Sequence, residues 1–554
     1  MGNYVRSAIE TIYAGEDDFI VIGLTGRTGS GCSTVAKILE SPMQNLRHSL
    51  FSGDTPQNND QRKEKIISRH FEKTWRPFRL LQVRSVITLR FVENGVDQAL
   101  SFFKKNGVTQ SVYDSAASVL NSLHIQFSAL NPNTPPAQII DFYSIILPGK
   151  SEELRQVLGE TLMIPLYQKA GTNIRISGSP FNEEVLEGGF FSLVRSIYDI
   201  IRKIIDANQQ LKEKTLIVVD ALRNPLEAIY LQNKITNFHL VAVSCSDEER
   251  KGRLAQQNFS VAQIEQIDQV EYANRELEVD ATYSIQDIQG CLQRADIYLS
   301  NPNGESEVFR LALLTNQIIR LISLIKRPGI VTPTPIERCM QIAYTAKLNS
   351  GCISRQVGAL VTDENFSIKA IGWNDTPQGQ VPCNLRNRGD LLNGADRPAF
   401  SNYEKNNKKY LENFTSRNIR YINIAETGRN VSYCFKAEYN SIDGKGNQVH
   451  TRSLHAEENA FLQISKYGGQ GVAGGYLFTT ASPCELCAKK AYQLGISKIY
   501  YIDPYPGISL SHILEGGTSN PSMELFSGAI GRSFHRLYSP IMAYKDELNA
   551  LAVK

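Results

Sequence analysis

Two short stretches decide how the C-terminal half of this sequence folds: Ser453-Leu454-His455-Ala456-Glu457-Glu458-Asn459-Ala460-Phe461 and Pro483-Cys484-Glu485-Leu486-Cys487. Between them, residues 475–480 form an apolar run of the length and composition of a buried β-strand. Each stretch reads as the start of a helix. The pattern therefore predicts helix, strand and helix in that order, with polar, metal-binding residue types at both helix starts.

The residue types at these helix starts are those of a catalytic zinc site. Two cysteines three positions apart can bind one zinc ion, and helix amides favour the thiolate there. His455 supplies a third ligand and leaves the fourth position open for water. Glu457 is close enough to face that water without binding the metal. The arrangement H-x-E…P-C-x-x-C is similar to the signature of zinc deaminases, so we predict that His455, Cys484 and Cys487 hold Zn²⁺ and that Glu457 is the catalytic acid–base.

Each half of the pattern has an ordinary interpretation when taken alone. A Cys-x-x-Cys pair can be a structural zinc knuckle or a redox pair, and His-Ala-Glu can be an unremarkable helical segment. The joint occurrence, with the strand between and Pro483 before the first cysteine, favours the catalytic site. The chemistry expected of it is activation of water by zinc. Glu457 moves a proton to N3 of a cytosine ring and then to the leaving amine.

Residues 355–361 and 371–377 read as a β-hairpin whose second strand ends in a polar loop. Here the sequence resembles deoxycytidylate deaminases, over most of residues 333–510, through a V-G-A strand, a G-[YW]-N-x-x-P turn and the H-A-E-x-N-A form of the zinc motif. The resemblance implies that Asn374 bonds the sugar or base and that Arg355 contacts phosphate. Tyr505, in a proline-rich loop, is a further candidate ligand contact. The alternative for Asn374 and for Tyr505 is turn formation, and the alternative for Arg355 is a solvated surface arginine.

The segment 384–450 is longer than the compact family pattern. It lies beside or contains Cys383, Cys434 and His450, which could form a second metal site or a regulatory lid. No Cys-x-x-Cys pair is present in it. A buried, small apolar role for Cys434 is the simpler interpretation.

The N-terminal half opens with a buried-strand pattern at 19–24 and a helical pattern at 35–39. The loop that joins them is Gly26-Arg27-Thr28-Gly29-Ser30-Gly31-Cys32-Ser33-Thr34. Strand, glycine-rich loop and helix in this order are the context of a phosphate-binding P-loop, whose amides hold phosphate oxygens. Ser33 stands where a hydroxyl ligand of Mg²⁺ belongs. Cys32 stands where the phosphate-binding lysine belongs, and a neutral thiol cannot replace an ammonium in phosphoryl transfer.

A second apolar run, 215–220, ends in Asp220, the position of a metal-directed carboxylate in parallel-sheet nucleotide binders. Further strands are predicted at 238–243 and 295–301. Residues 17–325 thus resemble P-loop nucleotide kinases and dephospho-coenzyme A kinases, with a long helical insert between loop and acid. We expect nucleotide binding there, with Mg²⁺, without phosphoryl transfer. The alternative is a degenerate scaffold that docks partners.

A proline-rich segment marks a boundary between two domains. Three prolines and a glycine between positions 328 and 335 interrupt any helix or central strand. We therefore predict two α/β domains: a P-loop NTPase-like parallel sheet over 1–327, a linker at 328–335, and a cytidine deaminase-like α-β-α sandwich over 336–554.

The chain has 554 residues, 59 Lys+Arg against 56 Asp+Glu, and nine cysteines. This composition excludes wholesale disorder. We expect no membrane span, and an odd cysteine count without a dense framework is typical of a reduced cytoplasmic protein. A net charge of +3 removes the electrostatic case for a dedicated nucleic-acid binder.

The two halves together resemble the bacterial anti-phage deoxycytidine nucleotide deaminases. That resemblance implies conversion of dCTP and dCMP to the uridine forms, depleting dCTP during infection. It also implies a small inhibitory RNA, a second regulatory nucleotide and a homo-oligomer, such as a hexamer. Three other hypotheses stay open: housekeeping dCMP deamination for thymidylate supply, a polynucleotide deaminase, which needs a basic, aromatic channel that we do not find, and a nucleotide-responsive switch with an inactive deaminase.

Overall fold

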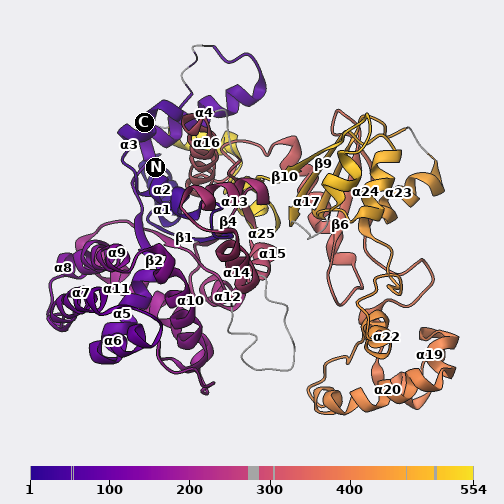
Figure 1. Cartoon of the computed structure of the whole chain (residues 1–554). Helices are drawn as coiled ribbons and strands as arrows, with labels where there is room; N and C mark the ends of the chain where they lie inside the picture. Colours follow the sequence, from indigo (N-terminus) through magenta and orange to yellow (C-terminus); the bar gives the residue numbers. More distant parts are fainter. Residues whose placement is uncertain are drawn as a thin grey trace. The chain divides into compact units, whose positions relative to one another are not determined.

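In a computed structural model the chain forms two compact units (Figure 1). The structure describes residues 2–51, 53, 55–271, 286–302, 306–468, 471–503 and 508–552. The first unit contains two segments of the chain, residues 1–332 and residues 527–554. The second unit contains residues 333–526, which lie between them in the sequence. The first crossing between units falls inside the predicted linker 328–335. The prediction that the second domain runs to residue 554 is wrong.

The C-terminal segment returns to the first unit through contacts that are distant in sequence. Strand β11 (Gly528–Ala529) pairs antiparallel with β5 (Ile297–Ser300). Helix α25 (Gly531–Tyr538) packs on α16 (Glu307–Lys326), and Glu547 of α26 (Tyr544–Ala552) forms an ion pair with Arg327. A local sequence pattern cannot reveal such pairings, because each partner is a short and unremarkable element by itself.

The first unit is built on a sheet in the order β11-β5-β4-β1-β3-β2. All neighbouring pairs are parallel except β11 with β5. The central strands are almost entirely buried, as expected of a parallel sheet covered on both faces. The remaining strands are β1 (Phe19–Thr25), β2 (Arg79–Gln82), β3 (Thr215–Asp220) and β4 (Phe238–Ser244).

Helices surround this sheet, and most of those between β2 and β3 form the predicted helical insert, at the lower left of Figure 1. The insert comprises α5 (Val83–Glu93), α6 (Val96–Lys105), α7 (Gln110–Ser128), α8 (Pro136–Asp141), α9 (Leu147–Leu158), α10 (Glu160–Ser177) and α11 (Ser192–Leu211). The other helices include α1 (Gly2–Asp17), α2 (Cys32–Glu40), α4 (Asn59–Thr74), α12 (Pro225–Lys234), α13 (Asp247–Gln256), α14 (Val261–Glu271) and α15 (Ile288–Arg294).

Helix α16 is long and apolar enough to span a membrane by length and composition. Its side chains Leu314, Ile318 and Ile322 are buried in the core that also contains β1 and β3. It packs against α4, α2 and β5. We therefore interpret α16 as a core helix of the first unit.

The second unit contains a mixed sheet in the order β10-β9-β8-β6-β7. The predicted hairpin is confirmed: β6 and β7 pair antiparallel around a turn in which Asp363 accepts hydrogen bonds from the amides of Asn365 and Ser367. Strand β6 is also antiparallel to β8, whereas β8, β9 and β10 run parallel. The strands are β6 (Gly358–Thr362), β7 (Ile368–Trp373), β8 (Tyr476–Ala481), β9 (Lys498–Asp503) and β10 (Ser522–Leu525).

Two glycines let helices approach the two faces of the hairpin. A Cβ on Gly358 would lie 2.0 Å from the carbonyl oxygen of Ala343 in α17 (Pro335–Ala346). A Cβ on Gly372 would lie 2.2 Å from the carbonyl oxygen of Ala456 in α23 (Ala456–Tyr467). Gly358 and Gly372 stand at adjacent register positions of the β6–β7 ladder and so face opposite sides. The sheet is thus covered by α17 on one face and α23 on the other.

The segment 384–450 folds as a small helical region with its own core (α19, α20 and α22, lower right of Figure 1). Two buried ion pairs, Arg386 with Glu404 and Arg388 with Glu438, lie in this core. Its helices are α18 (Arg388–Asn393), α19 (Asn402–Asn406), α20 (Lys408–Asn418), α21 (Ile422–Ala425) and α22 (Phe435–Asp443).

The second metal site that we considered as one possibility for this region does not form among the described residues. Cys383 is buried in a short 3₁₀ turn, and Cys434 precedes α22. His450 instead packs on the ring of Tyr439, with 4.1 Å between ring centroids. These three side chains do not make up a metal-binding group.

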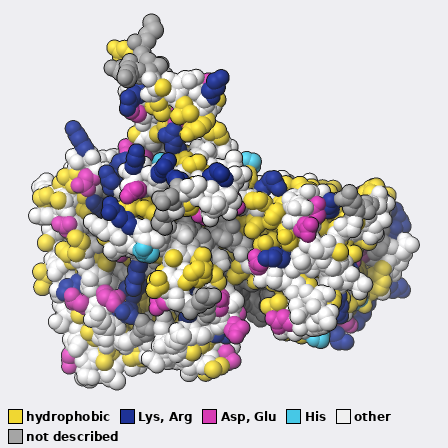
Figure 2. Space-filling model, turned by 90° about the horizontal axis from the view of Figure 1, so that it is seen from above, with side chains coloured by type: hydrophobic (Ala, Val, Ile, Leu, Met, Phe, Trp, Pro, Cys, Tyr) yellow, Lys and Arg dark blue, Asp and Glu magenta, His cyan; other side chains and the backbone are white. Residues whose placement is uncertain are grey.

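Charged side chains of both signs are visible on the face shown in Figure 2, between hydrophobic and polar ones. This mixture agrees with the small net charge of +3.

Candidate active site

The predicted metal ligands come together at two helix starts. His455 is the N-cap of α23, and Cys484 is the N-cap of α24 (Glu485–Gln493). Nδ1 of His455 lies 3.4 Å from Sγ of both Cys484 and Cys487. The three ligand atoms all lie within 4.8 Å of one another, and within the described part of the chain they form the candidate metal group.

The donor set fits a zinc ion. Hydrogen bonds from Cys487 and His455 lower the pKa of Cys484 to about 4, and the first turn of α24 adds positive backbone dipoles. The hydrogen bond to the Cys484 sulfur and burial raise the pKa of Cys487. Zinc is bound by the thiolate form of cysteine, so binding of the ion would displace any proton held by these sulfurs. Two soft thiolates and one imidazole are ligands that zinc prefers, with a fourth position left for water.

Glu457 lies beside this group and is nearly enclosed. Glu457 is 4% exposed, and burial raises the pKa of its carboxyl above the ordinary value. The hydroxyl of Thr479, in β8, donates to Oε1 of Glu457 over 3.2 Å. A buried carboxylate beside the candidate metal group, held at one oxygen, is placed to accept and release a proton.

The start of α23 is anchored from three directions. The amide of Leu454 donates to the carbonyl of Asp375 over 2.8 Å, and the side chain of Asn459 donates to the carbonyl of Trp373 over 3.0 Å. Glu458 pairs with Lys490 of α24. These bonds tie the helix carrying His455 to the end of β7 and to the helix that carries the cysteines.

Two of the predicted substrate contacts, Asn374 and Arg355, lie near the ends of β7 and β9. Asn374 follows β7, and its side chain accepts from the amide of Val357 over 2.6 Å and donates to the carbonyl of Arg355 over 2.7 Å. Arg355 forms an ion pair with buried Asp503 at the end of β9. Tyr505 lies outside the described residues. Asn374 thus fixes the strand ends, and its substrate role stays a prediction, as does that of Arg355.

The glycine-rich loop, residues 26–34, joins β1 to α2 in the first unit. Gly29 and Gly31 have φ of 88° and 112°, which side chains other than glycine rarely adopt. A Cβ on Gly26 would lie 2.5 Å from the carbonyl oxygen of Val243. The amide of Thr34 donates to the carbonyl of Gly31 over 3.0 Å as α2 begins.

The loop and the predicted acid are neighbours, as the sequence suggested. The hydroxyl of Ser33 donates to Asp220 over 2.8 Å. Burial raises the pKa of Asp220, and it raises that of Cys32 to about 12. Cys32 is therefore a neutral thiol, with its sulfur 3.8 Å from the hydroxyl of Ser30.

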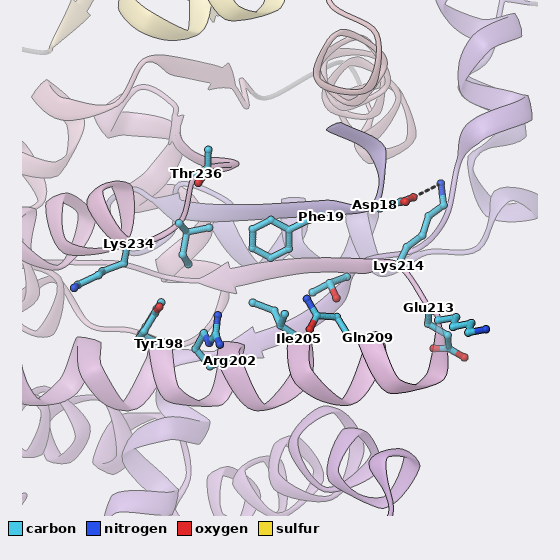
Figure 3. A pocket seen from close by; sticks show the side chains of 13 residues that line it. Asp18, Phe19, Tyr198, Arg202, Ile205, Gln209, Glu213, Lys214, Lys234 and Thr236 are labelled. Carbon is cyan, nitrogen blue, oxygen red and sulfur yellow. Dashed lines mark ion pairs between the residues drawn. The ribbon is translucent and has the colours of Figure 1, made fainter. Parts of the chain in front are cut away.

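A cavity of 780 Å³ lies at the opposite edge of this sheet (Figure 3). It lies between α11 and the starts of β1 and β3 and includes Phe19, Tyr198 and Lys234. Lys214, at its rim, pairs with Asp18 over 3.0 Å. None of the predicted site residues lines it.

Sequence reasoning missed Thr479 and Asp503 at the candidate active site, and it missed Glu271, whose carboxylate accepts from the amide of Thr28 in the glycine-rich loop. Thr479 lies within a strand pattern that explains it as a β-former, and Glu271 lies in a polar helix. Asp503 is the last residue of β9, and its position at a strand end was the only signal. Their roles depend on neighbours that the fold supplies.

A mixed sheet covered by helices, with a His-Cys-Cys group at two helix starts and a buried glutamate beside it, defines a zinc-dependent hydrolytic deaminase. The sequence model of the cytidine and deoxycytidylate deaminase zinc-binding region matches residues 333–503. The deoxycytidylate deaminase of Enterobacteria phage T2 is 30% identical over 168 residues, which are 30% of this chain and 78% of the relative. That of phage T4 is 28% identical over 168 residues, or 30% and 76% of the two chains.

The crystal structure of a dCMP deaminase from cyanophage S-TIM5, in complex with dCMP and dUMP, is 24% identical with a TM-score of 0.22. The match covers 35% of this chain and 99% of that one. By its sequence relatives, the chain belongs to the deoxycytidylate deaminase family.

Proposed function

We propose that the second unit deaminates free deoxycytidine nucleotides, dCTP as well as dCMP. The observation that carries this proposal is the group of His455, Cys484 and Cys487 with Glu457 buried beside it. The named activity of the phage T2 and T4 relatives, deoxycytidylate deamination, supports the substrate class.

The chemistry of this chain's own residues follows from the geometry. His455, Cys484 and Cys487 would hold a zinc ion, and the bound ion would supply the Lewis acidity that lowers the pKa of water. Glu457 accepts the water proton at its carboxylate, while Thr479 holds Oε1. The same carboxyl delivers that proton to N3 of cytosine, then takes the proton of the new C4 hydroxyl and passes it to the exocyclic amine. The C4–O bond forms, the C4–N bond breaks, and uracil nucleotide and ammonia are the products.

The proposal is tested by measuring ammonia and uracil products from cytidine, dCMP, dCTP and a cytosine-containing oligonucleotide. We expect turnover of dCMP and dCTP, lost in Glu457→Ala while the zinc content is unchanged. Turnover of the oligonucleotide alone would overturn the substrate class and keep the chemistry. Unchanged turnover in Glu457→Ala would refute the site.

We further propose that this activity depletes dCTP in defence against phage. The alternative is a housekeeping role in thymidylate supply. Measurement of dCTP in cells before and after infection separates the two roles, since only the defensive role predicts dCTP loss triggered by infection. The resemblance to anti-phage deaminases supports a homo-oligomer and an inhibitory RNA as parts of the same proposal.

For the first unit we propose a nucleotide-binding site at the glycine-rich loop, without phosphoryl transfer. The parallel sheet, the loop preceding α2 and the bond from Ser33 to Asp220 favour this role. Ser33 and Asp220 would hold Mg²⁺ with the nucleotide. The neutral thiol of Cys32 cannot stabilise a transferring phosphoryl group. Binding of a nucleotide without its hydrolysis, measured by calorimetry and phosphate release, is the expected result.

A further inference from the structure

The glycine-rich loop already holds an anion of its own chain. Glu271, in α14, is fully buried, and its carboxylate accepts from the amide of Thr28 over 3.1 and 3.2 Å. The hydroxyl of Thr28 donates to the same carboxylate. Nη1 of Arg223, which follows β3, adds an ion pair of 2.6 Å. A loop amide, a hydroxyl and a guanidinium are the groups that such a loop would offer to a phosphate oxygen.

A second acid of the same helix lies at the loop. Asp268 pairs with Arg27 over 2.8 Å and with Arg250 over 2.7 Å. Arg250 is 1% exposed and also donates to the carbonyl of Thr28 over 3.3 Å. Helix α14 therefore contacts the loop region through two carboxylates. Glu271 accepts from the backbone amide of Thr28, and Asp268 pairs with the guanidinium groups of Arg27 and Arg250.

Among the described residues, Arg27, Arg223 and Arg250, which contact the loop, are each paired with a carboxylate of the chain. Arg27 and Arg250 also pair with Asp247, over 2.5 and 3.0 Å. Because Cys32 is neutral, the loop lacks the lysine charge that would attract a further anion. A phosphate group reaching Thr28 and Arg223 must replace the carboxylate of Glu271, since two anions at one amide repel each other.

We propose that Glu271 is an internal competitor for the phosphate-bearing ligand of the glycine-rich loop, and that a free nucleoside phosphate binds by displacing it. This inference rests on the proposed nucleotide-binding role of the loop. It assigns the Thr28 amide and Arg223 as phosphate contacts, and it makes nucleotide binding and the docking of α14 on the loop mutually exclusive.

The test compares the full chain with Glu271→Gln, measuring affinity for pyrophosphate and for dCTP and dATP by calorimetry with Mg²⁺ present. Glutamine keeps the shape and removes the charge, so the affinity should rise about tenfold or more, the value of one charge-assisted hydrogen bond. Glu265→Gln, an exposed position of the same helix, removes an equal charge away from the loop and should leave affinity unchanged.

Hydrogen exchange of the wild-type chain gives a readout that needs no variant. Ligand binding should increase amide exchange in 261–271 and decrease it in the glycine-rich loop. Binding to wild type that is no weaker than to Glu271→Gln, or exchange in α14 that does not change, would overturn the inference and leave the loop proposal intact.

Two other outcomes are decisive as well. Failure of every variant to bind any phosphate would refute the loop proposal itself. Binding of a 5′-phosphorylated oligonucleotide in place of free nucleotides would overturn the assigned ligand. Deamination measured in parallel keeps all these outcomes separate from the fate of the deaminase proposal.

Discussion

The hydroxyl of Thr479 offers a sharp test of how the catalytic carboxylate is held. Thr479 is fully buried, and its hydroxyl has two acceptors: Oε1 of Glu457 at 3.2 Å and the carbonyl oxygen of Ala481 at 2.8 Å. Thr479→Val replaces the hydroxyl by a methyl group of similar size. The variant leaves the carboxylate in place and removes the bond that orients it.

The expected magnitude follows from this geometry. A hydrogen bond to a charged group contributes about 1.5–3 kcal/mol. One hydroxyl proton cannot serve both acceptors fully, and the contact to Glu457 is the longer of the two. We therefore expect the low end of the range, which is a fall of about tenfold in kcat. KM for dCMP should change by less than about twofold, because Thr479 orients a proton carrier and is not assigned to substrate binding.

The assay is steady-state ammonia release from dCMP, with zinc content and thermal unfolding measured on the same samples. Thr479→Ser restores the hydroxyl and should restore kcat. Thr480→Val is the matched control, since the Thr480 hydroxyl accepts a hydrogen bond from the backbone amide of Gly358 rather than contacting Glu457. Full kcat in Thr479→Val, or a loss in kcat equalled by Thr480→Val, would refute the assigned role.

Three further predictions concern packing, metal and pH. Gly372→Ala places a methyl group against the backbone of α23, so it should lower the free energy of unfolding by about 1–3 kcal/mol and reduce kcat. Gly446→Ala, with open space around the added methyl group, should change neither quantity. Urea unfolding and ammonia release measure both effects. Chelation of zinc should lower the melting temperature of the wild-type chain and leave that of Cys487→Ser unchanged, because metal binding to the folded state stabilises it; an equal shift in both would contradict the site. Burial lowers the pKa of His239 to about 3. Below pH 6.5 this histidine is therefore protonated in the unfolded chain and stays neutral in the folded chain, so the free energy of unfolding should fall by about 2 kcal/mol between pH 7 and pH 5. His239→Gln should remove that part of the pH dependence in urea titrations, and an unchanged slope would contradict it.

Much of the fold could be predicted from local pattern. Buried strands such as β1 and β3 are nearly continuous apolar runs, and the helix starts at His455 and Cys484 carry their chemistry in adjacent residues. The hairpin of β6 and β7 is equally local, since its turn is formed by the neighbouring residues around Asp363. Such features involve residues a few positions apart, and the chain connectivity itself keeps them together.

The sequence by itself determined the zinc motif and the deaminase class of the C-terminal half, and it is the basis on which we propose Glu457 as the acid–base and a nucleotide site in the N-terminal half. The tertiary structure decided that residues 527–554 complete the first unit, that Thr479 orients Glu457, and that Glu271 fills the glycine-rich loop. In each of these cases one ordinary side chain or short strand meets a partner far away in sequence. Its role comes from shared burial and from the pairing of a donor with an acceptor or of opposite charges, and these contacts exist only once the chain has packed.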